Sequence, residues 1–301
     1  MKLSQVPVER GLQVRLMSPL GSYPADTFTH RMSALVVSPE ICFSVVRLKG
    51  KDWSFSEVDN LTPLEIPLLG SIVPSGDAGD PYIYPYPTQQ TFLLETAADE
   101  DFEVQSISKC KNFLLERLKQ ISSQACNAGL AHRPPAMGGA PYRLIASQHS
   151  DRERCANYDR LEVAGPVVLR GVSALIKAHM AWRHGEFGEA ACIFLWISLD
   201  AAYSLILKRL RESGVINPSS KDAARYFEKI SGYDTEWEKF FEDDYENRIR
   251  AIHPENRFGA EARPQFLAGD FYELNDMLVP LFQSLISDPA FNSGARKLAI
   301  E

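Results

Sequence analysis

The sequence predicts an α+β protein in which a β-rich N-terminal domain precedes an all-α helical bundle. Short apolar segments separated by turn residues fill the first third of the chain, and long segments with helical periodicity fill the last part. A dense group of Pro and Gly residues separates the two patterns. We expect the β-rich domain with its closing helix at residues 1–130, a linker or surface loop at 131–164, and the bundle at 165–301. A chain of 301 residues is long enough for two domains.

The expected strands lie between Leu12 and about Val104. They are rich in Val, Ile, Leu and Phe, and they read LQVRLM, SALVVSP, ICFSVVRL, LEIPLLGSIV and TFLLETA. Stretches such as SPLGSYP and PSGDAGDPY supply turns between them. The segment PYIYPYP, residues 81–87, alternates Pro and Tyr, which favours an extended, exposed segment over a regular element. We expect its rings to pack a loop, and a stacking surface for a peptide or base is the alternative.

The closing helix of the first domain is expected in SISKCKNFLLERLKQISSQACNAG, where Gly129 provides a stop. Its apolar residues follow helical spacing: Ile107, Phe113, Leu114, Leu118 and Ile121. The next stretch, LAHRPPAMGGAPYRL, contains more Pro and Gly than a helix or strand interior tolerates. It therefore predicts the linker.

Five helices are expected after Gly165. The first is GPVVLRGVSALIKAHMAWRHG, and the second, EFGEAACIFLWISLDAAYSLILKRLRESG, is apolar nearly all round in its middle, which predicts a central position. A shorter helix, SSKDAARYFEKISG, is expected to begin at Ser219 or Ser220. DTEWEKFFEDDYENRIRAI and DFYELNDMLVPLFQSLIS complete the bundle.

Composition and charge exclude several classes of protein. A formal net charge of −7 and a pI near 5.5 argue against a surface built throughout to hold nucleic acid, although a local basic site stays compatible with them. The N-terminus lacks the apolar core of a signal peptide, and no run approaches the roughly 18 apolar residues of a membrane span. The five cysteines are scattered, without zinc-like spacing. We therefore expect a cytoplasmic protein, not attached to a membrane, with no metal and no cofactor.

Three residues of the helical region are candidates for chemistry. Asp200 lies among apolar neighbours, so we expect it either to reach solvent in a cleft or to have a partner such as Arg, His or a hydroxyl. Arg248 and His253 are five residues apart, and a regular helix would turn them away from each other. Pro254 disfavours the α conformation at His253, so its ring can turn back toward Arg248. An ordinary histidine at a helix C-terminus is the alternative.

Residues from about Gly165 to Ser287 resemble a HEPN domain, a helical superfamily marked by Arg, four to six residues and then His at the end of a late helix. YENRIRAIHP supplies that pattern, and Tyr245 falls where many members carry an aromatic residue. The resemblance implies a metal-independent endoribonuclease that acts as a homodimer, with Arg248, His253 and Asp200 as catalytic residues. It also implies RNA as substrate and a role as a toxin or defence effector, with the N-terminal domain as sensor for a regulatory ligand or protein.

Two interpretations of this region stay open. Arg250 and Arg257 would widen a phosphate-binding surface for RNA, whereas neighbouring glutamates favour a solvated mixed-charge surface. Ile249 follows the arginine, where many members carry a polar residue. The alternative function is therefore a non-catalytic HEPN-like module for dimerisation or for binding a nucleotide or RNA. We expect His179 and His184, which lie earlier in the chain, to be capping or packing residues.

Overall fold

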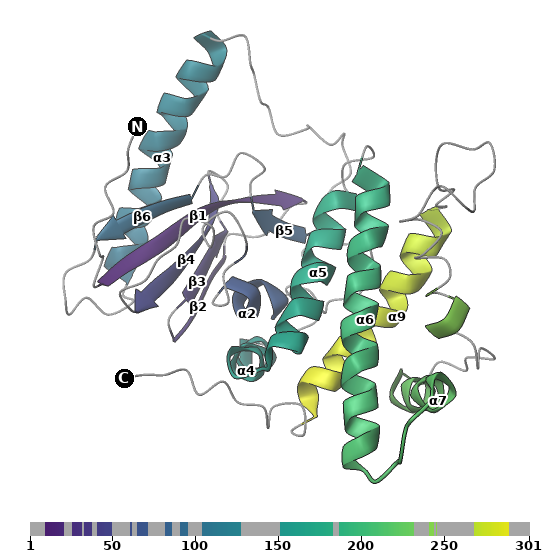
Figure 1. Cartoon of the computed structure of the whole chain (residues 1–301). Helices are drawn as coiled ribbons and strands as arrows, with labels where there is room; N and C mark the ends of the chain where they lie inside the picture. The colour runs from purple at the N-terminus through teal and green to yellow at the C-terminus, as the bar shows by residue number, and fades with distance from the viewer. Residues whose placement is uncertain are drawn as a thin grey trace, which may run out of the picture. The chain divides into compact units, whose positions relative to one another are not determined.

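The computed structural model of the chain belongs to the α+β class, as the sequence predicts (Figure 1). It describes residues 10–20, 26–31, 33–37, 41–49, 61, 65–71, 82–85, 91–95, 104–127, 151–182, 187–231, 241–243, 245 and 268–288. The chain divides into two compact units. The first consists of Met1–Leu69 and Asp80–Arg152, and the second of Gly70–Gly79 and Glu153–Glu301.

The first unit contains an antiparallel sheet of six strands. The strands are β1 (Arg10–Leu20), β2 (Asp26–His30), β3 (Ser33–Val37), β4 (Cys42–Lys49), β5 (Tyr82–Pro85) and β6 (Thr91–Glu95). Their order is β2-β3-β4-β1-β5, and β6 also pairs with β1. β5 and β6 pair with different stretches of β1, because β6 meets Gly11–Arg15 and β5 meets Met17–Leu20. β1 therefore connects all other parts of the sheet.

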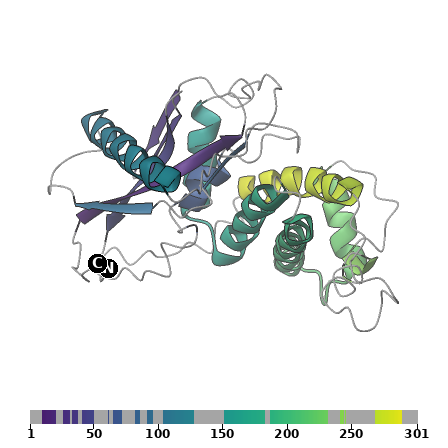
Figure 2. The same ribbon diagram turned by 90° about the horizontal axis from the view of Figure 1, so that it is seen from above.

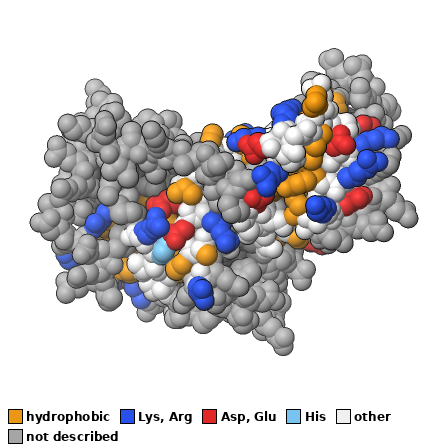
Figure 3. All heavy atoms as spheres, turned by 90° about the horizontal axis from the view of Figure 1, so that it is seen from below, with side chains coloured by type: hydrophobic (Ala, Val, Ile, Leu, Met, Phe, Trp, Pro, Cys, Tyr) orange, Lys and Arg blue, Asp and Glu red, His pale blue; other side chains and the backbone are white. Residues whose placement is uncertain are grey.

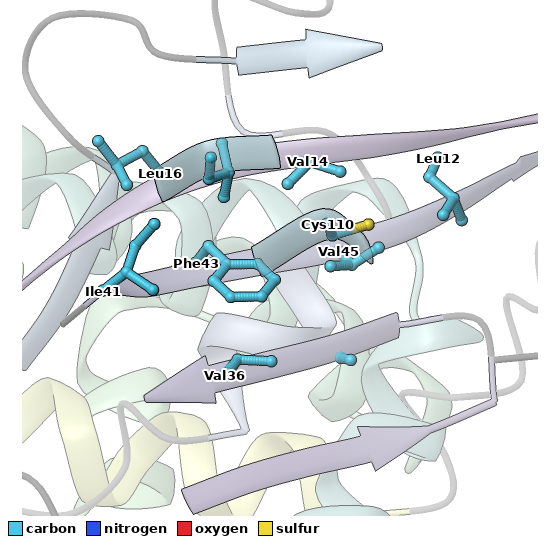
Figure 4. Close-up of a cluster of buried hydrophobic side chains, with 10 residues drawn as sticks. Leu12, Val14, Leu16, Val36, Ile41, Phe43, Val45 and Cys110 are labelled. Carbon is cyan, nitrogen blue, oxygen red and sulfur yellow. The ribbon is translucent and has the colours of Figure 1, made fainter. Parts of the chain in front are cut away.

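One face of the sheet holds the core of this unit. Side chains alternate between the two faces of a strand, so residues 12, 14 and 16 of β1 point the same way. They pack with Phe43 and Val45 of β4 and with Cys110 and Leu114 of the long helix α3 (Val104–Asn127) (Figure 4). Of the apolar residues that the sequence predicts on α3, Leu114 and Ile107 pack against this face, whereas Phe113 is exposed. Figure 2 shows α3 lying along the sheet. Burial raises the pKa of the Cys110 thiol to about 11.

The opposite face contacts the short helix α2 (Glu65–Gly70). Arg15 of β1 donates two hydrogen bonds to Glu65, from Nε to Oε1 at 2.7 Å and from Nη2 to Oε2 at 3.1 Å. Both side chains are buried. Because α2 lies within LEIPLLGSIV, the prediction of a strand in that segment is wrong. An apolar run fully buried on all sides carries no periodicity to distinguish strand from helix, and Pro67 is tolerated in a first helical turn.

Three further segments differ from the sequence predictions. PYIYPYP contributes a regular strand, β5, paired with β1. The strand β2 was not predicted, because its hairpin turns at Arg31, which has a φ of 47° without being Gly or Asn. Residues 151–162, expected in the linker, form helix α4 (Asp151–Glu162). Its composition is strongly polar, and the buried side chains of Tyr158 and Leu161 hold it in place.

The second unit is helical. Besides α4 it contains α5 (Pro166–Trp182), α6 (Gly188–Glu212), α7 (Ser220–Ser231) and α9 (Ala268–Ser287). α6 contacts α5, α7 and α9, which confirms its predicted central position. α5 and α9 approach each other closely at Gly171 of α5, where a Cβ atom would lie 2.3 Å from Cζ of Phe282 in α9.

By length and composition alone, α6 could cross a membrane. An 18-residue window of this helix has a mean hydropathy of 1.9, and 56% of that window is buried inside the protein. Core helices of globular bundles share these features. α6 packs against α5, α7 and α9 in the manner of such a core helix.

The start of α7 is fixed by a reciprocal cap. Ser219 Oγ accepts a hydrogen bond from the backbone N–H of Asp222, at 3.2 Å. The backbone N–H of Ser219 in turn donates to Asp222 Oδ2, at 2.8 Å. Of the two serines that the sequence offered, Ser219 is therefore the cap. The hydrogen bonds from its hydroxyl and backbone, in that order, lower the pKa of the Asp222 carboxyl.

Candidate functional site

Asp200 lies on the exposed side of α6. Its sequence neighbours Leu199 and Ala201 are buried, because successive helical residues point about 100° apart. Ser204 and Lys208, one and two turns further along, are exposed as well. The residue thus lies on an exposed helix surface.

The other predicted site residues lie outside the described residues. These are Arg248, His253, Arg250 and Arg257. Their convergence with Asp200 stays a prediction. The described residues do, however, place the beginning of the segment that carries them.

That segment begins at Phe241, which is buried between two helices. Its ring lies 4.7 Å from the ring of Tyr203 in α6 and 6.5 Å, edge-on, from that of Phe227 in α7. The next residue, Glu242, accepts a hydrogen bond of 2.6 Å from Ser220 Oγ at the start of α7. An aromatic contact and a polar contact therefore fix residues 241–243, which are helical, against α6 and α7.

The contact with α6 is made beside Asp200. Tyr203 follows Asp200 by three positions, and residues three apart are neighbours on a helix surface. Tyr245, four residues after Phe241, is helical and 52% exposed. The chain that leads to Arg248 thus starts within one helical turn of Asp200.

A second group of polar and aromatic side chains joins α5 to the beginning of α9. His179 Nε2 lies 2.7 Å from Asn275 Oδ1, and both residues are buried. Since an amide oxygen only accepts, Nε2 is the donor of this hydrogen bond. Trp182 stacks on Phe271 with ring centroids 4.1 Å apart. His179 is thus a packing residue, as expected, and His184 lies outside the described residues.

The charges of this unit are mixed. Burial, followed by repulsion from Arg170, lowers the pKa of Lys177 on α5. Figure 3 shows Lys and Arg side chains interspersed with Asp and Glu side chains among the described residues of one face. Within the described part of the chain, no three His, Cys, Asp or Glu side chains gather where they could hold a metal ion.

Comparisons of the chain with protein-family models, curated proteins and solved structures give no significant match. The resemblance to HEPN domains therefore rests on the sequence pattern of residues 165–287. Family, activity and partners stay proposals.

Proposed function

We propose that the helical unit is a metal-independent HEPN-type endoribonuclease with Arg248, His253 and Asp200 as its catalytic residues. The observation that supports it is the contact between Tyr203 and Phe241. Tyr203 lies one helical turn from Asp200 on α6, the central helix of the helical unit. Phe241 begins the segment that carries the Arg-x4-His pattern, so that segment begins close to Asp200.

Helical spacing supports the role of Arg248. Residues seven apart return to the same helix face, and Arg248 follows Phe241 by seven positions. A regular helix continuing from Phe241 would advance about 10 Å over that stretch. It would present Arg248 on the face that Phe241 turns toward α6. This spacing is compatible with a site shared by Arg248 and Asp200.

The chemistry needs no metal. RNA carries a 2′-hydroxyl beside each phosphate, and a histidine that titrates near neutral pH can take its proton as the oxygen attacks phosphorus. The bond from phosphorus to the 5′-oxygen of the next nucleotide breaks in the same step, and that oxygen leaves as a hydroxyl after taking up a proton. An arginine binds the phosphate oxygens and stabilises the charge that develops on them. In this proposal His253 moves the proton, Arg248 holds the phosphate, and Asp200 orients one of them. Arg250 and Arg257 extend the phosphate contact, and two copies of the chain form the active dimer.

Cleavage of RNA in the presence of EDTA tests the proposal. We expect the wild-type protein to cut single-stranded RNA, and His253→Ala or Arg248→Ala to reduce the rate at least about 100-fold, the scale of a lost acid–base group. Asp200→Asn removes the carboxylate charge alone. Asp243→Asn is the matched control, since Asp243 is also an exposed helical carboxylate of this unit.

The result depends on the pattern across variants. Loss of cleavage in the first three variants and full cleavage by Asp243→Asn would support the site. Equal rates in all variants would show that a contaminating nuclease is responsible. No cleavage by a folded wild-type dimer would contradict the proposal.

A non-catalytic binding module is the second candidate. The mixed charges in Figure 3 and the net charge of −7 favour it, because RNA substrates are held mainly by clustered cations. This candidate predicts that His253→Ala weakens dimerisation or nucleotide binding. It also predicts that the wild-type protein has no nuclease activity. Sedimentation and fluorescence anisotropy with a labelled oligonucleotide distinguish the two functions.

A further inference from the structure

Strand β2 lies at one edge of the sheet, and its outer side pairs with no other strand in the described part of the chain (Figure 1). It contains neither the lysine nor the proline by which natural proteins often block such an edge. Thr27 and Thr29 are exposed, whereas Phe28 between them is buried. The proposed function concerns the helical unit and leaves this edge unused. The edge is thus a candidate surface for a further strand.

The hairpin of β2 and β3 determines which backbone groups point away from the sheet. His30 pairs with Ser33 across a two-residue turn. In such a turn the flanking pair exchanges both of its hydrogen bonds, and the backbone groups of successive residues point to opposite sides of the strand. The N–H and C=O groups of Phe28 therefore face β3, as those of His30 do. Those of Thr27 and Thr29 point outward, and no hydrogen bond among the described residues uses them.

These outward groups are complementary to a second copy of the same strand. When two β2 strands pair antiparallel with Phe28 on the two-fold axis, Thr27 of each copy lies opposite Thr29 of the other. Four hydrogen bonds then form, and they use every outward donor and acceptor of the two threonines in both copies. An axis at either threonine would leave the other one opposite a residue outside β2. The strand therefore has one register in which it completes itself.

Charge also favours a second copy as the occupant of this edge. The same register sets residue 26, an aspartate, opposite His30 of the other copy at each end of the pair. These positions are not hydrogen-bonded across the axis, so side chains of the facing strands approach most closely there. A carboxylate opposite an imidazole is stabilising because it attracts the protonated ring. An unrelated strand would need an acidic and a basic residue at this same spacing.

We propose that β2 pairs with β2 of a second copy, so that the sheet continues across a two-fold axis at Phe28. The pairing belongs to the N-terminal unit and does not depend on the ribonuclease proposal. Two strands of five residues make a small contact compared with the roughly 1,200–2,000 Å² of a standard stable interface. The dimer should therefore form reversibly and depend on protein concentration.

Charge substitutions at the two exposed threonines of the full chain test the proposal. The double variant Thr27→Lys, Thr29→Lys sets lysine opposite lysine twice across the axis, which is destabilising. The matched control is Thr27→Lys, Thr29→Glu, which charges the same positions but sets each lysine opposite a glutamate. By sedimentation equilibrium we expect the control to associate like the wild type and the double-lysine variant to associate at least about tenfold more weakly.

Mixing two variants separates strand pairing from an effect of net charge. The double variant Thr27→Glu, Thr29→Glu should also associate weakly by itself, because glutamate then faces glutamate. An equimolar mixture with the double-lysine variant should associate at least as well as the wild type, since each lysine then faces a glutamate of the other chain.

Hydrogen exchange locates the contact in the wild-type protein. The amides of Thr27 and Thr29 should exchange more slowly as the protein concentration rises, whereas the Phe28 amide, which faces β3, should not change. Equal association by all variants would assign dimerisation to another surface. Equal loss in both lysine-containing variants would show that β2 pairs with a different edge or a different protein. Either result, or free exchange at Thr27 and Thr29 at every concentration, would overturn the proposal.

Discussion

Replacement of Gly171 by alanine should destabilise the helical unit, against the usual effect of this substitution in a helix. The added Cβ would lie 2.3 Å from Cζ and 2.7 Å from Cε1 of Phe282, and 3.0 Å from Cβ of Ala201. Carbon atoms normally keep about 3.5–4.0 Å. Phe282 is buried and must therefore shift by more than about 1 Å inside a packed core.

Two opposing terms set the magnitude. Overpacking costs about 1–3 kcal/mol, and this overlap belongs at the upper end, whereas Gly→Ala in a helix gains about 1 kcal/mol. The free energy of unfolding should thus fall by about 2 kcal/mol, and the melting temperature of the unit by about 4–8 °C. Differential scanning calorimetry measures both.

A matched control and a rescue make this prediction specific. Gly188→Ala on α6 meets only Cζ3 of Trp182, at an ordinary 3.7 Å, and should be neutral or slightly stabilising. Phe282→Leu should relieve the overlap, so that the double variant is less destabilised than the sum of the single ones. A Gly171→Ala protein that melts at or above the wild-type temperature would refute the close helix contact.

Three further outcomes follow from the described side chains. Glu65→Gln removes the carboxylate charge that pairs with the buried Arg15 guanidinium and should lower the free energy of unfolding, measured by urea denaturation, by about 3–5 kcal/mol, whereas replacing both residues by apolar ones should cost much less. The Asp222 carboxyl, whose pKa is lowered from 3.8, adds stability that is complete above that pH and is lost as the pH falls through the folded-state value. Acid unfolding should therefore be less steep in Asp222→Asn, and an identical pH profile would contradict the cap. Burial raises the pKa of Cys42 to about 12 and that of Cys110 to about 11, so both thiols should resist a thiol reagent at pH 8 until the protein unfolds.

The sequence predicts elements well where periodicity is strong. The helix of residues 268–287 forms as expected even though Pro280 interrupts it, because its apolar positions are buried along its whole length. α2 was missed since every one of its residues is buried, and burial on all sides leaves no alternation to detect. α4 was missed for the opposite reason, because only Tyr158 and Leu161 show that the polar segment packs.

The candidate site is predictable only in part. The sequence placed Asp200 on the central helix and left open whether it reaches solvent or is buried with a partner, because neighbours in sequence are not neighbours on a helix surface. The contact of Tyr203 with Phe241 and that of His179 with Asn275 join residues far apart in the chain. No local pattern encodes such pairs, so only the folded chain reveals them.

The position of β1 also constrains how the N-terminal unit forms during synthesis. β4 emerges from the ribosome soon after β1, but β5 and β6, which complete its other side, are more than sixty residues away. At about 5–20 residues per second, that edge of β1 stays unpaired for several seconds. An unpaired edge is open to pairing with another chain, so aggregation of nascent protein should depend on how fast residues 21–95 are translated.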